Sequence, residues 1–247
     1  MTDSARSGAI SFMTDKSTSQ RNEVTGISNA EFFAKHAAPG RIGLAGGNLL
    51  IERVIRKAQR HLRADNSPSA WSHAFLFGSQ REDGHRWILE SDLEIHHRQI
   101  RLGVQENRVA KFHDEATYTN VAVLDFGLDA ETTRQVMTAA LDLLAGQSHY
   151  SLRELVGTLI TLRRQGLRER DNLLARDGAF YCSAMVQHCY RAAGIDLAAG
   201  VTTKNVTPED IAATPRPHTA WVLSRSPDLP VRKRLLARLK RSAQPLT

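Results

Sequence analysis

The stretch that decides the fold is the run WSHAFLFG at residues 71–78, in which a histidine opens a series of apolar side chains. A second apolar run covers residues 86–91, and Asp83-Gly84 between the two runs is a turn signal. We therefore expect a β-hairpin whose first strand begins at His73.

The second informative segment is FYCSAMVQHCY at residues 180–190, where a loop gives way to a helical pattern. Cys182 lies at the start of the predicted helix, which runs to Ala193 and ends before Gly194. The positive end of a helix dipole favours a thiolate. A histidine beside the thiol can take its proton and later protonate the leaving group. Cys182 and His73 therefore predict a cysteine nucleophile with a histidine base.

Further elements are expected around these two segments. Asn120 begins a strand that runs to residue 126, and Asp129 is a plausible N-cap of a helix that ends at Gly146. A helical face follows in residues 54–62, a helix starts at Thr207-Pro208, and a last strand covers residues 221–223. The glycine-rich segment 40–47 is predicted to be a turn region.

The positive charge is concentrated at the C-terminal end. The net charge is +7, and residues 223–247 hold seven basic side chains against one acid. The rest of the chain is near neutral, so we expect no specific nucleic-acid partner. Residues 231–241 would form a helix with leucines on one side and cations on the other, a pattern typical of contact with an anionic membrane or a protein. Docking of this tail on the body is an equal alternative.

The cysteine content predicts free thiols. Cys182 and Cys189 would lie on one helix with their Cα atoms about 10 Å apart, beyond the reach of a disulfide. They lack CxxC spacing, and the adjacent His96 and His97 would point to opposite faces of a strand, so no metal and no cofactor are expected. No signal peptide or membrane span is recognised, which favours the cytoplasm, with delivery by a signal-independent route as an alternative.

Several short segments, taken in order, resemble a known family. They are GNLL at 47–50, WSHAFL at 71–76, WILES at 87–91, GQSHY at 146–150, FYCSAMV at 180–186 and NVTPEDI at 205–211. Together they resemble the circularly permuted papain-like amidases of the YaeF/YiiX type, relatives of the NlpC-type peptidases and of the lecithin:retinol acyltransferase group. The sequence departs from the family pattern at Phe75, where glycine is usual, and at Ala184, where an acid is usual.

The resemblance implies an α+β, permuted papain-like fold in which an antiparallel sheet packs on the nucleophile helix. The polar composition of residues 1–28 predicts a flexible leader and the charge of residues 223–247 marks the basic tail, so the catalytic domain that the resemblance implies is placed at 29–222. The resemblance assigns Cys182 as the nucleophile, His73 as the base and Glu90 as the group that orients the imidazole. Tyr150 and Tyr181 are expected to contact the substrate or the oxyanion.

The register of the hairpin leaves the orienting carboxylate open. A strict two-residue turn at Asp83-Gly84 would place His73 opposite Glu94, with Asp92 and Glu90 further along the same face. A longer loop would change that register. We keep Glu90, with Asp92 and Glu94 as the alternatives.

The expected activity is cleavage of an amide bond through a thioester acyl-enzyme, with a peptidoglycan-type peptide or another acyl amide as the substrate. A second hypothesis is a lipid-directed thiol acyl hydrolase or acyltransferase at a membrane surface, which the basic tail would suit. A third is a catalytically silent binding module. The paired cysteine and histidine favour an enzyme over a binding module.

Overall fold

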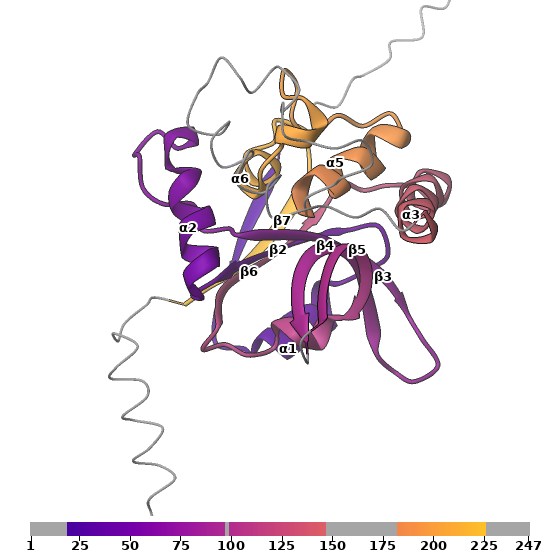
Figure 1. Ribbon diagram of the computed structural model, residues 1–247, viewed down its shortest axis with the longest axis horizontal. Coiled ribbons are helices and arrows are strands. Elements are labelled where there is room, and N and C mark those ends of the chain that lie inside the picture. The colour runs from indigo at the N-terminus through magenta and orange to yellow at the C-terminus, as the bar shows by residue number, and fades with distance from the viewer. Residues whose placement is uncertain (1–18, 97–98, 147–181, 226–247) are drawn as a thin grey trace, which may run out of the picture.

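The computed structural model describes residues 19–96, 99–146 and 182–225, and it is built around one seven-stranded sheet (Figure 1). The strand order is β1-β7-β6-β2-β3-β4-β5. The strands are β1 (Gln20–Val24), β2 (Ile42–Gly47), β3 (His73–Gln80), β4 (Arg86–His96), β5 (Gln99–Arg108), β6 (Tyr118–Asp125) and β7 (Thr219–Ser224). The described helices are α1 (Asn29–His36), α2 (Leu50–Ala58), α3 (Ala130–Ala145), α5 (Cys182–Ala192) and α6 (Pro208–Ala212), with short 3₁₀ turns η1 (Arg60–Leu62), η2 (Val109–Phe112) and η4 (Thr203–Asn205). The predicted α+β class is confirmed.

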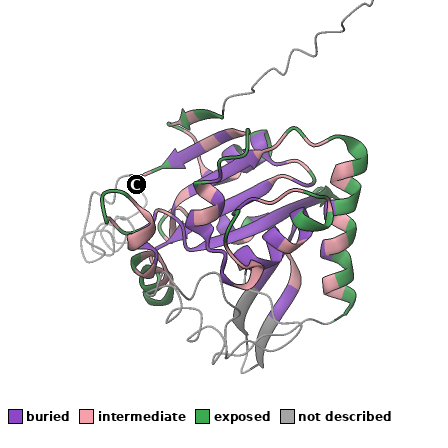
Figure 2. Ribbon diagram, turned by 90° about the horizontal axis from the view of Figure 1, so that it is seen from above, coloured by how far each residue is buried: buried purple, intermediate pink, exposed green. Residues whose placement is uncertain are grey.

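Helices cover the sheet on both faces. Successive side chains of β3 point to opposite faces and pack into different core clusters. Ala74 and Leu76 belong to a core cluster that includes Met185 and Val186 of α5. Phe75 and Phe77 point the other way, into a cluster that includes Phe33 and Phe32 of α1 and Phe112 of η2. We call these the α5 face and the α1 face, and Figure 1 shows the two helices on opposite sides of the sheet. The buried residues follow the central strands between them (Figure 2).

The glycine-rich segment 40–47 is not the predicted turn region, because residues 42–47 form the fully buried strand β2 in the middle of the sheet. Gly43 pairs with Phe75 of β3. A Cβ atom on Gly43 would lie 2.2 Å from the Phe75 ring, which fills the space above the glycine. Glycine in a strand often marks such a close approach, and composition alone cannot distinguish that use from a turn.

We expect Gly43→Ala to lower the free energy of unfolding by about 1–3 kcal/mol, because the added methyl group overpacks the core against Phe75. Denaturant unfolding measures the loss. In a Phe75→Leu background the same substitution should cost less, since the ring that it meets is gone. An equal cost in both backgrounds would show that Phe75 is not the cause.

The predicted start of the folded domain at residue 29 is too late. Residues 20–24, expected to belong to a flexible leader at 1–28, form β1, which pairs in parallel with β7. Every other pair of neighbouring strands in the described sheet is antiparallel, so the sheet is mixed rather than purely antiparallel as predicted. The predicted tail helix at 231–241 lies outside the described residues.

The predicted helix boundaries agree with the structure where the capping signals are strong. Asp129 is the N-cap of α3 and accepts a hydrogen bond from the backbone N–H of Thr132, and Gly146 is the C-cap. Thr207 caps α6 in the same way, with Asp210 as the third residue of a capping box. Across the described ranges no helix is both long and apolar enough to cross a membrane.

Candidate active site

The hairpin of β3 and β4 brings Glu90 close to His73. Its turn is longer than two residues: the N–H of Arg81 bonds to the carbonyl of His85, and Gly84 has a φ of 75°, as in a three-residue hairpin loop. The register then shifts again between Phe77 and Gln80. Leu76 pairs with Leu89, and continuing this register places Glu90 opposite Phe75, one diagonal step from His73. The strict turn that favoured Glu94 does not form.

His73 and Glu90 form a buried hydrogen-bonded pair. Nε2 of His73 lies 2.7 Å from Oε2 of Glu90, and the Glu90 side chain is fully buried. An ionised carboxylate only accepts hydrogen bonds, so the Nε2–H of His73 donates. The histidine ring also lies against Phe75 and Phe112, with centroid distances of 6.1 and 5.8 Å. These contacts hold the imidazole in one orientation.

The second oxygen of Glu90 is held by two further residues. Oε1 accepts a hydrogen bond from Nδ2 of Asn107 at 2.6 Å and one from Nζ of Lys111 at 2.6 Å. Asn107 comes from β5, where it pairs with Ile88 of β4, and Lys111 comes from η2. The carboxylate therefore has partners on both oxygens, as a buried charge requires.

Charge and burial act on the pKa of Glu90 in opposite directions. Burial by itself raises the pKa of this carboxyl, but the hydrogen bond from His73 and the positive charges of His73 and Lys111 outweigh it and lower the pKa from 4.5 to about 2. Glu90 is therefore ionised throughout the neutral range. It can stabilise a positive charge on the His73 imidazole.

We expect the stability of the protein to fall in acid partly through Glu90. The unfolded carboxyl binds a proton near pH 4.5, whereas the folded one resists protonation down to about pH 2. Between these values the unfolded state binds more protons, so the free energy of unfolding decreases as the pH falls. In Glu90→Gln this decrease should be shallower over the same window. Denaturant unfolding of both proteins from pH 2 to 6 measures it, and parallel curves would contradict the assignment.

Cys182 is the first residue of α5, as predicted, and is partly exposed. It shares one helical stripe with Met185, Val186 and Cys189, which all pack in the core cluster on the α5 face. Its neighbour Ser183 is buried and donates a hydrogen bond to the carbonyl of Val206 at 2.6 Å, which anchors the first turn. The thiol thus lies on the sheet-facing stripe of a fixed helix N-terminus.

The two cysteines differ sharply in environment. Cys189 is fully buried, and burial raises the pKa of its thiol to about 12. It is therefore a core residue. Cys182 is the only described cysteine with solvent access.

The helix of Cys182 packs against the two strands that carry His73 and Glu90, β3 and β4. However, α5 covers the α5 face, whereas His73 and Glu90 lie with Phe75 and Ile88 on the α1 face. His73 is the first residue of β3 and Cys182 is the first residue of α5. A thiol and an imidazole that lie toward opposite faces in this way can meet only at the end of the sheet where β3 begins.

The other predicted site residues are not placed. Tyr150 and Tyr181 lie outside the described residues. The backbone positions of Asp92 and Glu94 are on β4, but their side chains lie outside the described part of the chain, as do those of His96 and His97.

Sequence reasoning missed Asn107 and Lys111. Strand β5 could have been found from the alternation of Ile100, Leu102 and Val104, since period-two apolar residues are typical of a strand. Asn107 would then have been placed beside Glu90. No sequence pattern marks Lys111, because its hydrogen bond to Glu90 depends on where η2 lies relative to β4.

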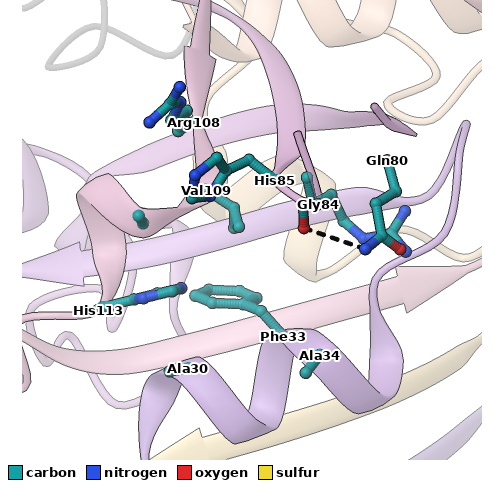
Figure 3. A pocket seen from close by; sticks show the side chains of 11 residues that line it. Ala30, Phe33, Ala34, Gln80, Gly84, His85, Arg108, Val109 and His113 are labelled. Carbon is teal, nitrogen blue, oxygen red and sulfur yellow. Dashed lines mark hydrogen bonds between the residues drawn. The ribbon is translucent and has the colours of Figure 1, made fainter. Parts of the chain in front are cut away.

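A pocket of about 220 Å³ opens elsewhere on the α1 face, between α1, the β3–β4 turn and η2 (Figure 3). Phe33 and His113 lie alongside one another there, with ring centroids 6.3 Å apart. The residues that line the pocket do not include His73, Glu90 or Cys182. It is therefore a separate feature from the candidate active site.

No protein-family model matches this chain, and no curated protein matches it. Among the residues that the structure describes, no three histidine, cysteine, aspartate or glutamate side chains gather closely enough to hold a metal ion.

Proposed function

We propose that this protein is a cysteine hydrolase of permuted papain-like fold, which cleaves an acyl amide through a thioester intermediate. The observation that carries the proposal is the buried His73–Glu90 pair, with Nε2 of the imidazole committed to a carboxylate. The helix that starts with Cys182 packs on the same two strands. A nucleophile, a base and a group that orients the base are the three parts of such a site.

The proposed chemistry follows from the roles of these groups. His73 takes the thiol proton of Cys182 through Nδ1, since Nε2 is bonded to Glu90. The thiolate attacks the acyl carbon, and the backbone N–H of Cys182 is a donor for the oxyanion. The amine leaves with the proton from His73, and a thioester remains. Water, deprotonated by His73, then attacks the thioester, which releases the acid and returns the proton to the sulfur.

Asn107 and Lys111 complete this account as positioning residues. They hold the carboxylate oxygen of Glu90 that does not face the histidine. The carboxylate therefore cannot rotate away from His73 without breaking two hydrogen bonds. Its negative charge favours the imidazolium that forms when the thiol is deprotonated.

The identity of the fold as permuted papain-like belongs to the same proposal. Support comes from the order of the parts along the chain: the histidine strand, the glutamate strand and then the cysteine helix. This order resembles that of the YaeF/YiiX-type amidases. Phe75, at the position where that pattern has glycine, is fully buried against Phe112, with ring centroids 4.6 Å apart. The α1 face is therefore filled by aromatic rings beside the histidine.

Acylation by p-nitrophenyl acetate tests the proposal without knowledge of the natural substrate. We expect a burst of p-nitrophenol and an acetyl group on Cys182, detected by intact mass and peptide mapping. Cys182→Ala should reduce the turnover about a thousandfold or more, because the nucleophile is lost. Cys189→Ala is the matched control and should leave the burst unchanged. An acetyl group on Cys189 instead, or equal turnover in Cys182→Ala, would overturn the proposal.

A further inference from the structure

Helix α2 exposes an unusual number of large aliphatic side chains. Leu50 is 80% exposed, and Leu49, Ile51 and Val54 are 55%, 44% and 45% exposed. Leu50, Ile51 and Val54 are neighbours on one side of the helix, because residues three and four apart share a face. In Figure 1, α2 stands at the flank of the molecule, on the side opposite α3. We call these four residues the α2 apolar stripe.

The helix is held to the body by polar contacts, not by its apolar residues. None of the residues of α2 is buried. Arg56 donates to the carbonyls of Ser69 and Gly47 at 2.7 and 3.3 Å, and Gln59, just after the helix, donates to the carbonyl of Trp71 at 2.9 Å. Polar groups therefore fasten the inner side of α2, and Leu50, Ile51 and Val54 are left exposed.

The start of the helix reinforces this orientation. Leu49 occupies the N-cap position and makes no side-chain hydrogen bond there, although polar residues are strongly preferred at such a position. The carboxylate of Glu52 accepts a hydrogen bond from the N–H of Leu49 at 3.0 Å instead. The leucine side chain at the cap therefore provides no capping interaction, and it is 55% exposed just before the helix.

A row of cations runs beside the α2 apolar stripe. Arg53, Lys57 and Arg60 are exposed and follow one another at spacings of four and three residues. The acid of this helix, Glu52, is directed to the backbone of Leu49. Behind the helix, Arg63 and Arg225 are paired with carboxylates, Arg63 with Asp65 and Glu209 and Arg225 with Glu115, so the positive charge beside the stripe comes from the helix's own exposed cations.

We propose that α2 docks on the surface of an anionic lipid bilayer, with the α2 apolar stripe inserted among the acyl chains. A convex helix with bulky aliphatic residues on one side and cations next to them is the pattern of an interfacial helix. The cations would lie at the level of the anionic head groups. Protein interfaces are instead anchored by aromatic and arginine side chains that fill pockets, and the stripe contains no aromatic residue.

The location of α2 determines which end of the sheet would face the bilayer. The helix follows β2, whose last residue, Gly47, donates its N–H to Oγ of Ser72 at 3.0 Å. Ala45 of the same strand pairs with His73. The end of the sheet from which α2 departs is therefore the end at which β3 begins. A bilayer bound to α2 would lie toward that end, and this inference does not depend on the hydrolase proposal.

Flotation of the full chain with vesicles tests the proposal. We expect binding to vesicles of phosphatidylglycerol and phosphatidylcholine, weak binding to phosphatidylcholine alone, and loss of binding as salt increases. The double variant Leu50→Ser with Ile51→Ser should lower the partition coefficient about tenfold, because two inserted side chains are removed. The matched control is Leu141→Ser on α3, which is 49% exposed and should bind like the wild type.

Two results would overturn the proposal. One is a double variant that partitions like the wild type while a variant with Arg232, Lys233, Arg234 and Arg238 changed to Gln loses binding, since the contact would then belong to the tail. The other is a wild-type dimer by light scattering that the double variant dissociates, without vesicle binding, since a second copy would then cover the stripe. Circular dichroism and thermal unfolding establish that the variants are folded.

Discussion

Iodoacetamide should alkylate Cys182 at least about a hundredfold faster than Cys189 in the folded protein near neutral pH, because reaction requires a thiolate with solvent access. Cys189 has neither, since it is fully buried and its pKa is raised to about 12. Cys182 lies at a helix N-terminus and is partly exposed. Quenched time points followed by peptide mapping give both rates from one sample.

The contribution of His73 appears in a variant series. In a Cys189→Ser background, His73→Ala should slow alkylation of Cys182 about tenfold, because the base that favours the thiolate is removed. A substitution of the pocket residue His113→Ala is the matched control, since that histidine lies elsewhere on the α1 face. Equal labelling of both cysteines in the folded wild type would contradict the activation of Cys182.

The second large effect is expected at Glu90. Glu90→Ala should lower the free energy of unfolding by about 3–5 kcal/mol, because it leaves the buried partners of the carboxylate without their counter-charge. Lys111 and Asn107 both bond to the same oxygen, and His73 bonds to the other. Denaturant unfolding at pH 7 measures the loss.

A variant that removes both charges distinguishes the stability lost with the charge network from the stability lost with side-chain packing. Glu90→Leu combined with Lys111→Met removes both charges and keeps apolar volume, so it should recover much of the stability that Glu90→Ala loses. Exposed Glu131→Ala on α3 is the control and should change the stability by less than about 1 kcal/mol, as surface ion pairs contribute little. A cost of under about 1 kcal/mol for Glu90→Ala would show that the pair is not a buried charge network.

Several elements of the fold can be predicted from the sequence, because their boundaries depend on residues that are close together in the chain. Asp129 and Gly146 delimit α3 as predicted, and Cys182 begins its helix as predicted. The boundaries of α3 depend on capping chemistry within a few residues, which the sequence displays directly. The start of the Cys182 helix depends on a change from loop residues to a helical pattern, which is equally local.

The wrong predictions for residues 40–47 and 20–24 have one physical cause. The structure of each segment depends on contacts with a segment that is distant in the sequence. Gly43 reads as a turn residue until Phe75 of another strand is seen over it. Gln20–Val24 reads as a polar leader, and it becomes a strand because β7 offers an unpaired edge. Neither partner is visible from local composition.

The residues of the candidate site also fall into two groups: those that the sequence predicted and those whose place depends on contacts between distant segments. Glu90 was preferred by resemblance, although a strict turn favoured Glu94, and the longer loop with Gly84 resolves the register. Lys111 was missed because its contact with Glu90 joins η2 to β4. The alternation of a strand places His73 and Phe75 on one face, but the sequence did not indicate that Phe112 packs there while α5 covers the opposite face.

The central claim is that His73 serves as the base for Cys182, and the most direct test is the distance between them. A crystal structure of the protein with Cys182 acylated by a substrate-like acyl probe would give the separation between Sγ of Cys182 and Nδ1 of His73. Proton transfer requires hydrogen-bond geometry, so we predict about 3–4 Å, with Glu90 still bonded to Nε2. A separation of more than about 8 Å in an ordered site would contradict the account, because no proton could pass between the two side chains.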